Sequence, residues 1–259
     1  MKKIFVILFC LSILGNCALA AQNPCDVKLG SHAAVTPADR QDQKWWMPRH
    51  NAILERNKQG NVDIIMIGDS ITHGWEKSGK PVWDKYYANR NAVNMGFSGD
   101  RTQHVLWRLE HGEIDNISPK LTVIMIGTNN SNGTDNTAEE IADGIKAIVC
   151  QVRTKLPDTK ILLLAIFPRG DAEQRNVKDQ DAAYNDQWAK NDKVNKIISK
   201  LADKKMIYYL DINKKFLNKK GMLPVETYPD LLHPNEKGYE IWAEAMEPII
   251  IKLTGEKKK

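Results

Sequence analysis

The sequence predicts an α/β fold in which five parallel strands form a central sheet covered by helices on both faces. Five short, continuous apolar runs indicate strands buried on both faces, at residues 62–67, 92–95, 121–126, 161–167 and 206–212. Helical patterns precede, separate and follow these runs, at residues 48–58, 102–109, 138–156, 185–202 and 236–253. Such regular alternation is typical of a doubly wound parallel sheet.

Local signals support the individual helices. Pro48 stands in the first turn of the first helix, where a proline costs no backbone hydrogen bond. The helix at 138–156 carries Ile141 and Ile145 on a stripe of apolar residues at helical spacing. The last helix follows Asn235, a good N-cap residue. The long polar connection at 168–183 is expected to be a solvated surface loop, with a mobile rim over a binding site as the alternative.

The N-terminus has the pattern of an export signal. A basic pair, an apolar run at residues 4–9 and the small-residue ending Ala18-Leu19-Ala20 predict that residues 1–20 are removed and that the protein is exported, periplasmic or secreted. Lipid attachment at Cys17 is an alternative, disfavoured by the bulky Asn16 before it. No later segment approaches the length of a membrane helix. We expect an arm at 21–44, one domain at 45–253 and a basic polar tail at 254–259.

The charge of the chain is unremarkable once the two ends are set aside. The formal net charge is +5, and most of it falls in the predicted signal and in the tail. The domain therefore has no broad basic face of the kind that binds nucleic acid. Nothing in the sequence indicates an oligomeric state, and no cofactor or metal is implied.

Two cysteines, Cys25 and Cys150, remain after removal of the signal. Cys150 lies nearly opposite the apolar stripe of its predicted helix and should face away from the core. An oxidising compartment permits a disulfide between the two, which would tie down the N-terminal arm. Two unpaired thiols are the alternative.

Candidate catalytic residues lie at opposite ends of the predicted domain. Asp230 and His233 are three residues apart and would face the same way on one helical turn, so that the carboxylate could orient the imidazole. Ser70 follows the first predicted strand and is the candidate nucleophile for that base. A serine that only caps a helix is the alternative.

Two further segments follow the next strands, at the same expected edge of the sheet. Gly99 could bring a backbone N–H close to a ligand, and the Asn129 side chain could donate a hydrogen bond. A plain turn and an Asx-turn are the respective alternatives. A nucleophile, an acid–base pair and two donors are together the parts that acyl transfer requires.

At this point the chain resembles the SGNH or GDSL-type hydrolases. The likeness is strongest to the branch with the catalytic subunits of platelet-activating-factor acetylhydrolase, through residues 46–51, 99–109 and 127–130, and it covers most of residues 45–253. The four family blocks are Gly68-Asp69-Ser70, Gly99, Gly127-Thr128-Asn129-Asn130 and Asp230-Leu231-Leu232-His233. The resemblance implies a flavodoxin-like three-layer sandwich, which agrees with the five expected strands.

The resemblance also implies roles for single residues. Ser70 is the expected nucleophile, His233 the base and Asp230 its orienting acid, while the oxyanion hole consists of the Ser70 and Gly99 backbone amides and the Asn129 side chain. Residues flanking these blocks are expected to bind substrate: Asp69, Trp75, Asp100, Arg101 and Asn130. Asn130 replaces an aspartate found in many members, and Arg101 replaces a small residue.

Other aromatic and histidine residues receive less specific expectations. Trp75 could stack on a sugar or an acyl chain, with core packing as the alternative. His73 shares the turn of Ser70 and lacks an orienting acid, so it is not the expected base. His104 is expected to be a surface or packing residue.

These residues predict a serine esterase that acts through an acyl-enzyme on Ser70 and removes short acyl groups, above all O-acetyl groups, from carbohydrate or glycan. A short-chain phospholipid or lysophospholipid esterase is the alternative with the same chemistry. Two other classes are disfavoured. A metallophosphoesterase would need more carboxylate and histidine ligands than the loop at 68–74 offers, and a non-catalytic glycan-binding module would not need a nucleophile.

Overall fold

The computed structural model describes residue 25 and residues 30–257, so the predicted signal at 1–20 and Cys17 lie outside the described residues. The sheet has five parallel strands in the order β2-β1-β3-β4-β5, as expected for a flavodoxin-like fold. The strands are β1 (Ile64–Gly68), β2 (Ala92–Gly96), β3 (Leu121–Met125), β4 (Lys160–Leu164) and β5 (Ile207–Leu210). All five predicted runs therefore contain strands. Four strands are shorter than their apolar runs, and β2 extends one residue beyond its run, to Gly96.

Burial on both faces explains why the strand sequences are continuously apolar. Along β1, Ile64 and Met66 belong to one hydrophobic cluster, whereas Ile65 and Ile67 belong to the other. Successive side chains of a strand point to opposite faces, so every position of this strand must be apolar.

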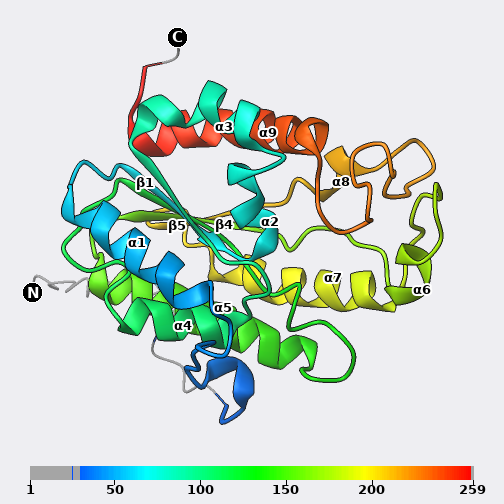
Figure 1. Ribbon diagram of the computed structural model, residues 1–259, viewed down its shortest axis with the longest axis horizontal. Coiled ribbons are helices and arrows are strands. Elements are labelled where there is room, and N and C mark those ends of the chain that lie inside the picture. The colour runs from blue at the N-terminus through cyan, green and yellow to red at the C-terminus, as the bar shows by residue number, and fades with distance from the viewer. Residues whose placement is uncertain (1–24, 26–29, 258–259) are drawn as a thin grey trace, which may run out of the picture.

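Helices cover both faces of the sheet and complete a three-layer sandwich (Figure 1). One face is covered by α1 (Trp46–Lys58), α4 (Thr102–Glu110), α5 (Ala138–Lys155) and α7 (Asp186–Ile198). The other is covered by α3 (Lys80–Tyr86) and α9 (Glu236–Thr254). The short helices are α2 (Ser70–His73), α6 (Ala172–Arg175) and α8 (Asn213–Phe216), with 3-10 turns η1 (Ala33–Val35), η2 (Gly74–Glu76), η3 (Ala88–Arg90) and η4 (Ser199–Leu201).

The helix ends follow local capping chemistry. The Asn235 side chain accepts a hydrogen bond from the Gly238 amide at 3.2 Å, so Asn235 caps α9 as predicted. Asn185 caps α7 rather than lying within it, because its side chain accepts from the Trp188 amide at 2.9 Å. Beyond Ile198 the predicted helix continues as η4.

The N-terminal arm packs on α4 and α5. The Thr102 hydroxyl donates to the Ala34 carbonyl at 2.8 Å, and Cys25 forms a disulfide with Cys150 on α5. The predicted bridge is thus confirmed. At the other end, Gly255 adopts a left-handed conformation (φ 75°) and ends α9. Among the described helices, none is both long and apolar enough to cross a membrane.

Candidate active site

Ser70 lies where β1 passes into α2. Asp69 caps this short helix, accepting from the Ile71 amide at 3.0 Å, and Ser70 is its first residue. Gly68 is required just before it, because a Cβ there would overlap the Thr72 side chain and the Met125 carbonyl. The tight turn therefore holds the Ser70 hydroxyl at the carboxyl edge of the sheet.

Asp230 and His233, near the C-terminal end of the sequence, lie beside Ser70. Ser70 Oγ lies 2.8 Å from His233 Nε2, and His233 Nδ1 lies 2.6 Å from Asp230 Oδ2. If Nδ1 carries the proton that Asp230 accepts, Nε2 is free to accept the serine proton. Residues 163 positions apart are thus joined in one hydrogen-bonded chain.

The acid–histidine pair is not built on a helical turn, so the predicted local geometry is wrong. Residues 229–233 form turns and bends before α9, and Leu231 has a positive φ of 55°. Asp230 Oδ1 accepts from the amides of Leu232 at 3.0 Å and His233 at 2.7 Å. This folds the carboxylate back onto the imidazole in the manner of an Asx-turn.

The charge on Asp230 is stabilised by these hydrogen bonds. Burial alone would raise the pKa of Asp230, but the bonds from the His233 side chain and backbone outweigh it and bring the pKa below its usual range. The carboxylate is therefore ionised at neutral pH and can stabilise a protonated imidazole.

The two candidate donors line the same pocket as Ser70 and His233. Gly99 has a φ of 78°, and Asn129 Nδ2 donates to the Asp100 carbonyl at 2.9 Å, which fixes its amide. An amide carries two hydrogens, so Asn129 has a second one to offer. The pocket measures about 510 Å³. Such an arrangement can hold an ester carbonyl and stabilise the charge that develops on its oxygen.

Trp75 does not line this pocket, and the expectation that it contacts substrate is wrong. Its side chain is 0 % exposed and packs against the rings of Tyr87, Tyr239 and Trp242. The residue faces the core between the sheet, α3 and α9. The core alternative is the correct one.

Asp69 and Asp100 are likewise fully buried and do not line the pocket. One Asp69 oxygen caps α2 while the other has no partner, and burial raises the pKa of this carboxyl to about 7. The Asp100 carboxylate accepts from Trp46 Nε1 at 2.8 Å and Arg108 Nε at 2.9 Å. The Asp69 carboxyl thus caps a helix, and the Asp100 carboxylate holds side chains of the neighbouring helices and of the arm.

Neither Arg101 nor Asn130 lines the pocket. Arg101 forms an ion pair with Asp135 at 2.6 Å. Asn130 is fully buried, accepts from the Thr102 amide at 3.0 Å and donates to Gln103 Oε1 at 3.1 Å. Asn130 therefore ties the start of α4 to the loop after β3, a role in which its amide donor is used.

Neither neighbouring histidine competes with His233. His73 Nδ1 lies 3.0 Å from Ser98 Oγ, and burial, helped by the nearby Arg49, lowers its pKa to about 4. His104 Nδ1 accepts from the Arg101 amide at 2.9 Å, and burial also lowers its pKa to about 4. Both rings are neutral structural groups at neutral pH.

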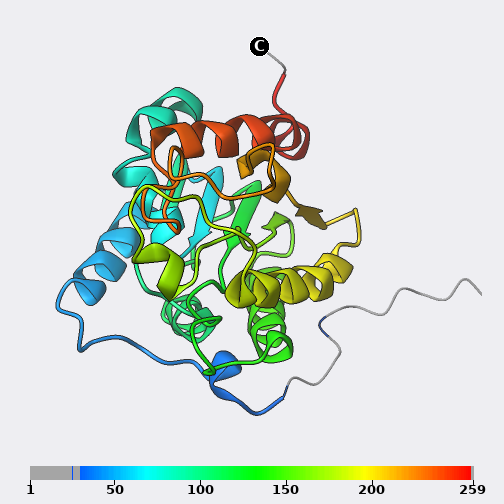
Figure 2. The same cartoon turned by 90° about the vertical axis from the view of Figure 1, so that its right-hand side faces the viewer.

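The polar connection at 168–183 supplies a contact to the acid–histidine turn that the sequence did not predict. Arg175 Nε donates to the Asp230 carbonyl at 2.9 Å, and the Gly170 amide donates to the Leu231 carbonyl at 2.7 Å. Figure 2 shows this yellow-green segment beside the orange segment that leads into α9. No local sequence pattern marks Arg175, because its partner lies 55 residues away.

Arg169 links the same connection to the third block. This arginine is 3 % exposed, and its Nη1 donates to the Thr128 carbonyl and to Asn132 Oδ1, each at 2.9 Å. Burial lowers its pKa to about 10. The connection thus joins the Asn129 loop to the turn that carries Asp230 and His233.

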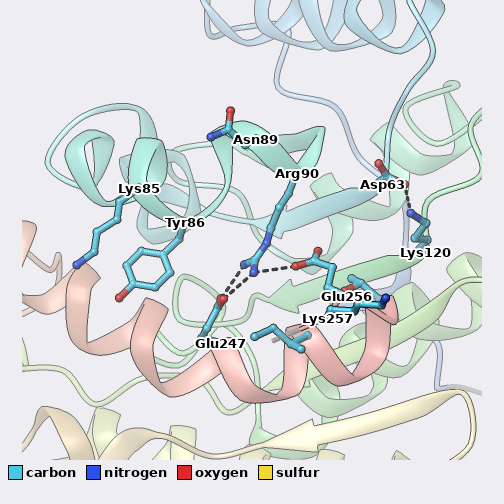
Figure 3. A pocket seen from close by; sticks show the side chains of 11 residues that line it. Asp63, Lys85, Tyr86, Asn89, Arg90, Lys120, Glu247, Glu256 and Lys257 are labelled. Carbon is cyan, nitrogen blue, oxygen red and sulfur yellow. Dashed lines mark hydrogen bonds and ion pairs between the residues drawn. The ribbon is translucent and has the colours of Figure 1, made fainter. Parts of the chain in front are cut away.

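A larger hollow lies at the opposite edge of the sheet (Figure 3). Five of its charged side chains pair with one another: Arg90 with Glu247 at 2.6 Å and Glu256 at 2.9 Å, and Lys120 with Asp63 at 2.8 Å. It contains none of the candidate catalytic residues. Within the described part of the chain, no group of three or more His, Cys, Asp or Glu residues is placed to hold a metal ion.

Comparison with known proteins gives a consistent picture. The profile of the GDSL-like Lipase/Acylhydrolase family matches residues 66–241. The alpha2 subunit of platelet-activating factor acetylhydrolase IB from Homo sapiens is 35% identical over 229 residues, which cover 87% of this chain and 90% of that protein.

Two solved structures share the fold. A GDSL-like lipase from Bacteroides thetaiotaomicron superposes with a TM-score of 0.62 at 21% identity, covering 81% of this chain and 97% of that one. A mutant acetyl-xylooligosaccharide esterase from Geobacillus superposes with a TM-score of 0.55 at 20% identity, covering 77% and 98%.

Proposed function

Because the chain belongs to the GDSL-like lipase/acylhydrolase family and is a carboxylic ester hydrolase, we propose that it removes acetyl groups from carbohydrate or glycan through an acyl-enzyme on Ser70. The observation that carries this proposal is the unbroken hydrogen-bonded chain from Ser70 through His233 to Asp230.

The reaction has two steps. Ser70 Oγ attacks the ester carbon while His233 Nε2 takes the hydroxyl proton, and the tetrahedral oxyanion accepts hydrogen bonds from the Ser70 and Gly99 amides and from Asn129. His233 then gives the proton to the departing alcohol. Water, deprotonated by the same imidazole, attacks the acyl-enzyme and releases acetate. Asp230 remains ionised throughout and stabilises the imidazolium.

A short acyl group suits the lining of the pocket. Among the described residues around Ser70, apolar side chains come from Leu232, Pro234 and Tyr239, and the others are polar or glycine. A long acyl chain would need a larger apolar surface to leave water, at roughly 0.8 kcal/mol for each buried CH₂. The relative and one of the solved structures are named for acetyl esters.

Carbohydrate is the proposed alcohol component because the chain has the pattern of an export signal, and glycans are the common acetylated polymers outside the cytoplasm. The Cys25–Cys150 disulfide supports an oxidising compartment. The runner-up substrate is a short-chain phospholipid, which is favoured by the 35% identity to platelet-activating factor acetylhydrolase.

A substrate panel tests the proposal. Acetate release is measured from acetylated monosaccharides, acetylated polysaccharides and acetyl phospholipids, with Ser70→Ala as the matched control. We expect hydrolysis of acetylated sugars at a higher kcat/KM than of acetyl phospholipids. The reverse order would make phospholipid the preferred substrate in place of carbohydrate. Acetate release by Ser70→Ala at the wild-type rate would refute the acyl-enzyme.

A further inference from the structure

The pocket around Ser70 continues into a second hollow beneath the N-terminal arm. The two share four lining residues: His73, Lys77, Ser98 and Gly99. The second hollow adds Arg40 and Trp45. The two hollows therefore form one groove. The part of it that Arg40, Trp45 and Lys77 line is called the arm groove.

The arm groove offers an aromatic face to solvent. Trp45 is 37 % exposed, and its ring lies 5.9 Å from the His73 ring and 6.2 Å from that of Phe97. The Arg40 guanidinium also lies over the ring, with its Cζ 6.0 Å from the ring centroid, so only the exposed part of the indole is open to a ligand. An indole face of this kind binds the apolar face of a sugar ring.

The arm groove is also positively charged. Arg40 Nη1 donates to the Ser98 carbonyl at 2.7 Å and lies 3.2 Å from Asp100 Oδ1, which places the guanidinium against Gly99. Asp100 offsets part of this charge, but it is shared with Arg108. Lys77 is exposed and, within the described chain, forms no ion pair.

Among the described residues, Asp100 is the one carboxylate that pairs with either cation, through Arg40. None of the described residues lining either hollow is Asp or Glu. The exposed Glu76 carboxylate lies 3.8 Å from His73 Nε2, but both terminal nitrogens of Arg49 hold it, at 2.9 Å and 2.7 Å. His73, with its pKa lowered to about 4 by burial, adds no charge at neutral pH.

We propose that the arm groove binds the alcohol part of the substrate and that this part is an acidic sugar, with its ring on Trp45 and its carboxylate beside Lys77 and Arg40. The proposal rests on the acetylesterase function proposed above and narrows its substrate class. The proposed substrate needs both a sugar ring and a negative charge. The indole binds a face of the sugar ring, and the two cations favour an anion next to the scissile ester.

The test compares two esters that differ only at C6, where one carries a carboxylate and the other a hydroxymethyl group: a mono-O-acetyl methyl glucuronoside and the mono-O-acetyl methyl glucoside acetylated at the same position. Their kcat/KM ratio is measured for wild type, Lys77→Gln, Lys77→Glu and the matched control Lys252→Gln. Lys252 is exposed on α9, away from the groove. Wild type should prefer the uronoside by roughly three- to tenfold at low salt, and added salt should weaken the preference.

Lys77→Gln should bring this ratio close to one and Lys77→Glu should invert it, while Lys252→Gln should retain the wild-type ratio. Trp45→Ala should lower kcat/KM for both sugars by roughly tenfold, the loss expected for one stacked ring, whereas Trp45→Phe should recover part of it. Equal rates on the two sugars for wild type, or equal effects of Lys77→Gln and Lys252→Gln, would overturn the proposal.

A phospholipid headgroup is the other possible source of negative charge. A soluble acetylated glycerophosphodiester tests for it, since this ester carries an anion without a sugar ring. If this ester were hydrolysed better than the uronoside and Trp45→Ala left its rate unchanged, the groove would serve a phospholipid headgroup and the acidic-sugar assignment would be refuted. If wild type hydrolysed the neutral acetyl sugar without any charge preference, the acidic-sugar proposal would fail while the proposed acetylesterase would stand.

Discussion

Arg175 contacts both the backbone carbonyl and the carboxylate of Asp230. Its Nε donates to the Asp230 carbonyl at 2.9 Å, and its Nη2 lies 3.4 Å from Asp230 Oδ2. The Leu231 residue that follows has a positive φ, so the turn depends on such outside contacts to keep its shape. The connection at 168–183 is thus packed against the site rather than being only a solvated loop.

We therefore predict that Arg175 positions the acid–histidine pair. Arg175→Ala should lower kcat on an activated acetyl ester by roughly tenfold or more with little change in KM, because a small displacement of the base affects the chemical step. The acid limb of the pH–rate profile should move to higher pH, since loss of a nearby cation makes protonation of the pair easier.

Arg175→Lys should restore part of the charge effect but not the contact to the carbonyl. The matched control is Lys178→Gln, because Lys178 is an exposed cation of the same connection and forms no ion pair within the described chain. An Arg175→Ala enzyme with the wild-type kcat and pH profile would show that the contact is only structural.

Asn129 should matter for turnover more than for binding. Asn129→Ala should lower kcat by roughly 10² to 10³, as expected for the loss of one oxyanion-hole donor. Asn89→Ala, on the far side of the molecule, provides the control. Retention of the wild-type kcat in an Asn129→Ala variant with an unchanged Tm would remove Asn129 from the oxyanion hole.

The buried Asp69 should make stability depend on pH. Its pKa of about 7 in the folded protein exceeds the ordinary 3.8, so the folded state holds this proton where the unfolded state has released it. The free energy of unfolding should then fall as pH rises from about 4 to about 7.

Asp69→Asn removes this ionisation and keeps an N-cap residue of equal quality. The variant should be more stable than wild type at pH 8, and the difference should shrink toward pH 4, as measured by denaturant unfolding. Asp171→Asn, which replaces the partly exposed cap of α6, should show no such trend. A difference between Asp69→Asn and wild type that is constant with pH would refute the burial argument.

The disulfide should stabilise the fold by anchoring the arm. Opening the link between Cys25 and Cys150, 125 residues apart, should cost roughly 2 to 4 kcal/mol. Reductant should therefore lower the Tm of wild type but leave that of Cys150→Ser unchanged. Thiol labelling of the denatured protein before reduction gives the direct check, because Cys25 or Cys150 would be modified only if the bridge were absent.

The sheet could be predicted because strands buried on both faces have continuous apolar sequences. Each of the five strands lies within, or within one residue of, a continuous apolar run. By contrast, α3 covers only Lys80–Tyr86 and is too short to show a helical period. Strand number and order could thus be anticipated from the sequence and the family resemblance, whereas short helices such as α3 could not.

The site residues that directly follow strand ends could be predicted from the sequence. The direction in which a side chain points could not. Ser70, Gly99 and Asn129 meet because parallel strands end at one edge of the sheet. Trp75 follows Ser70 closely in sequence, yet its side chain turns into the core. Arg175 was missed for a third reason, since contacts between distant loops leave no periodic trace.

The central claim is that Ser70 is the nucleophile, and covalent labelling tests it most directly. Wild type is treated with an organophosphonate, and the modified peptide is located by mass spectrometry while residual esterase activity is followed. We predict one label per chain, on the peptide containing Ser70, with activity lost in proportion to labelling and no label on Ser70→Ala. Complete labelling elsewhere in the chain, or full activity in the Ser70→Ala variant, would contradict the account.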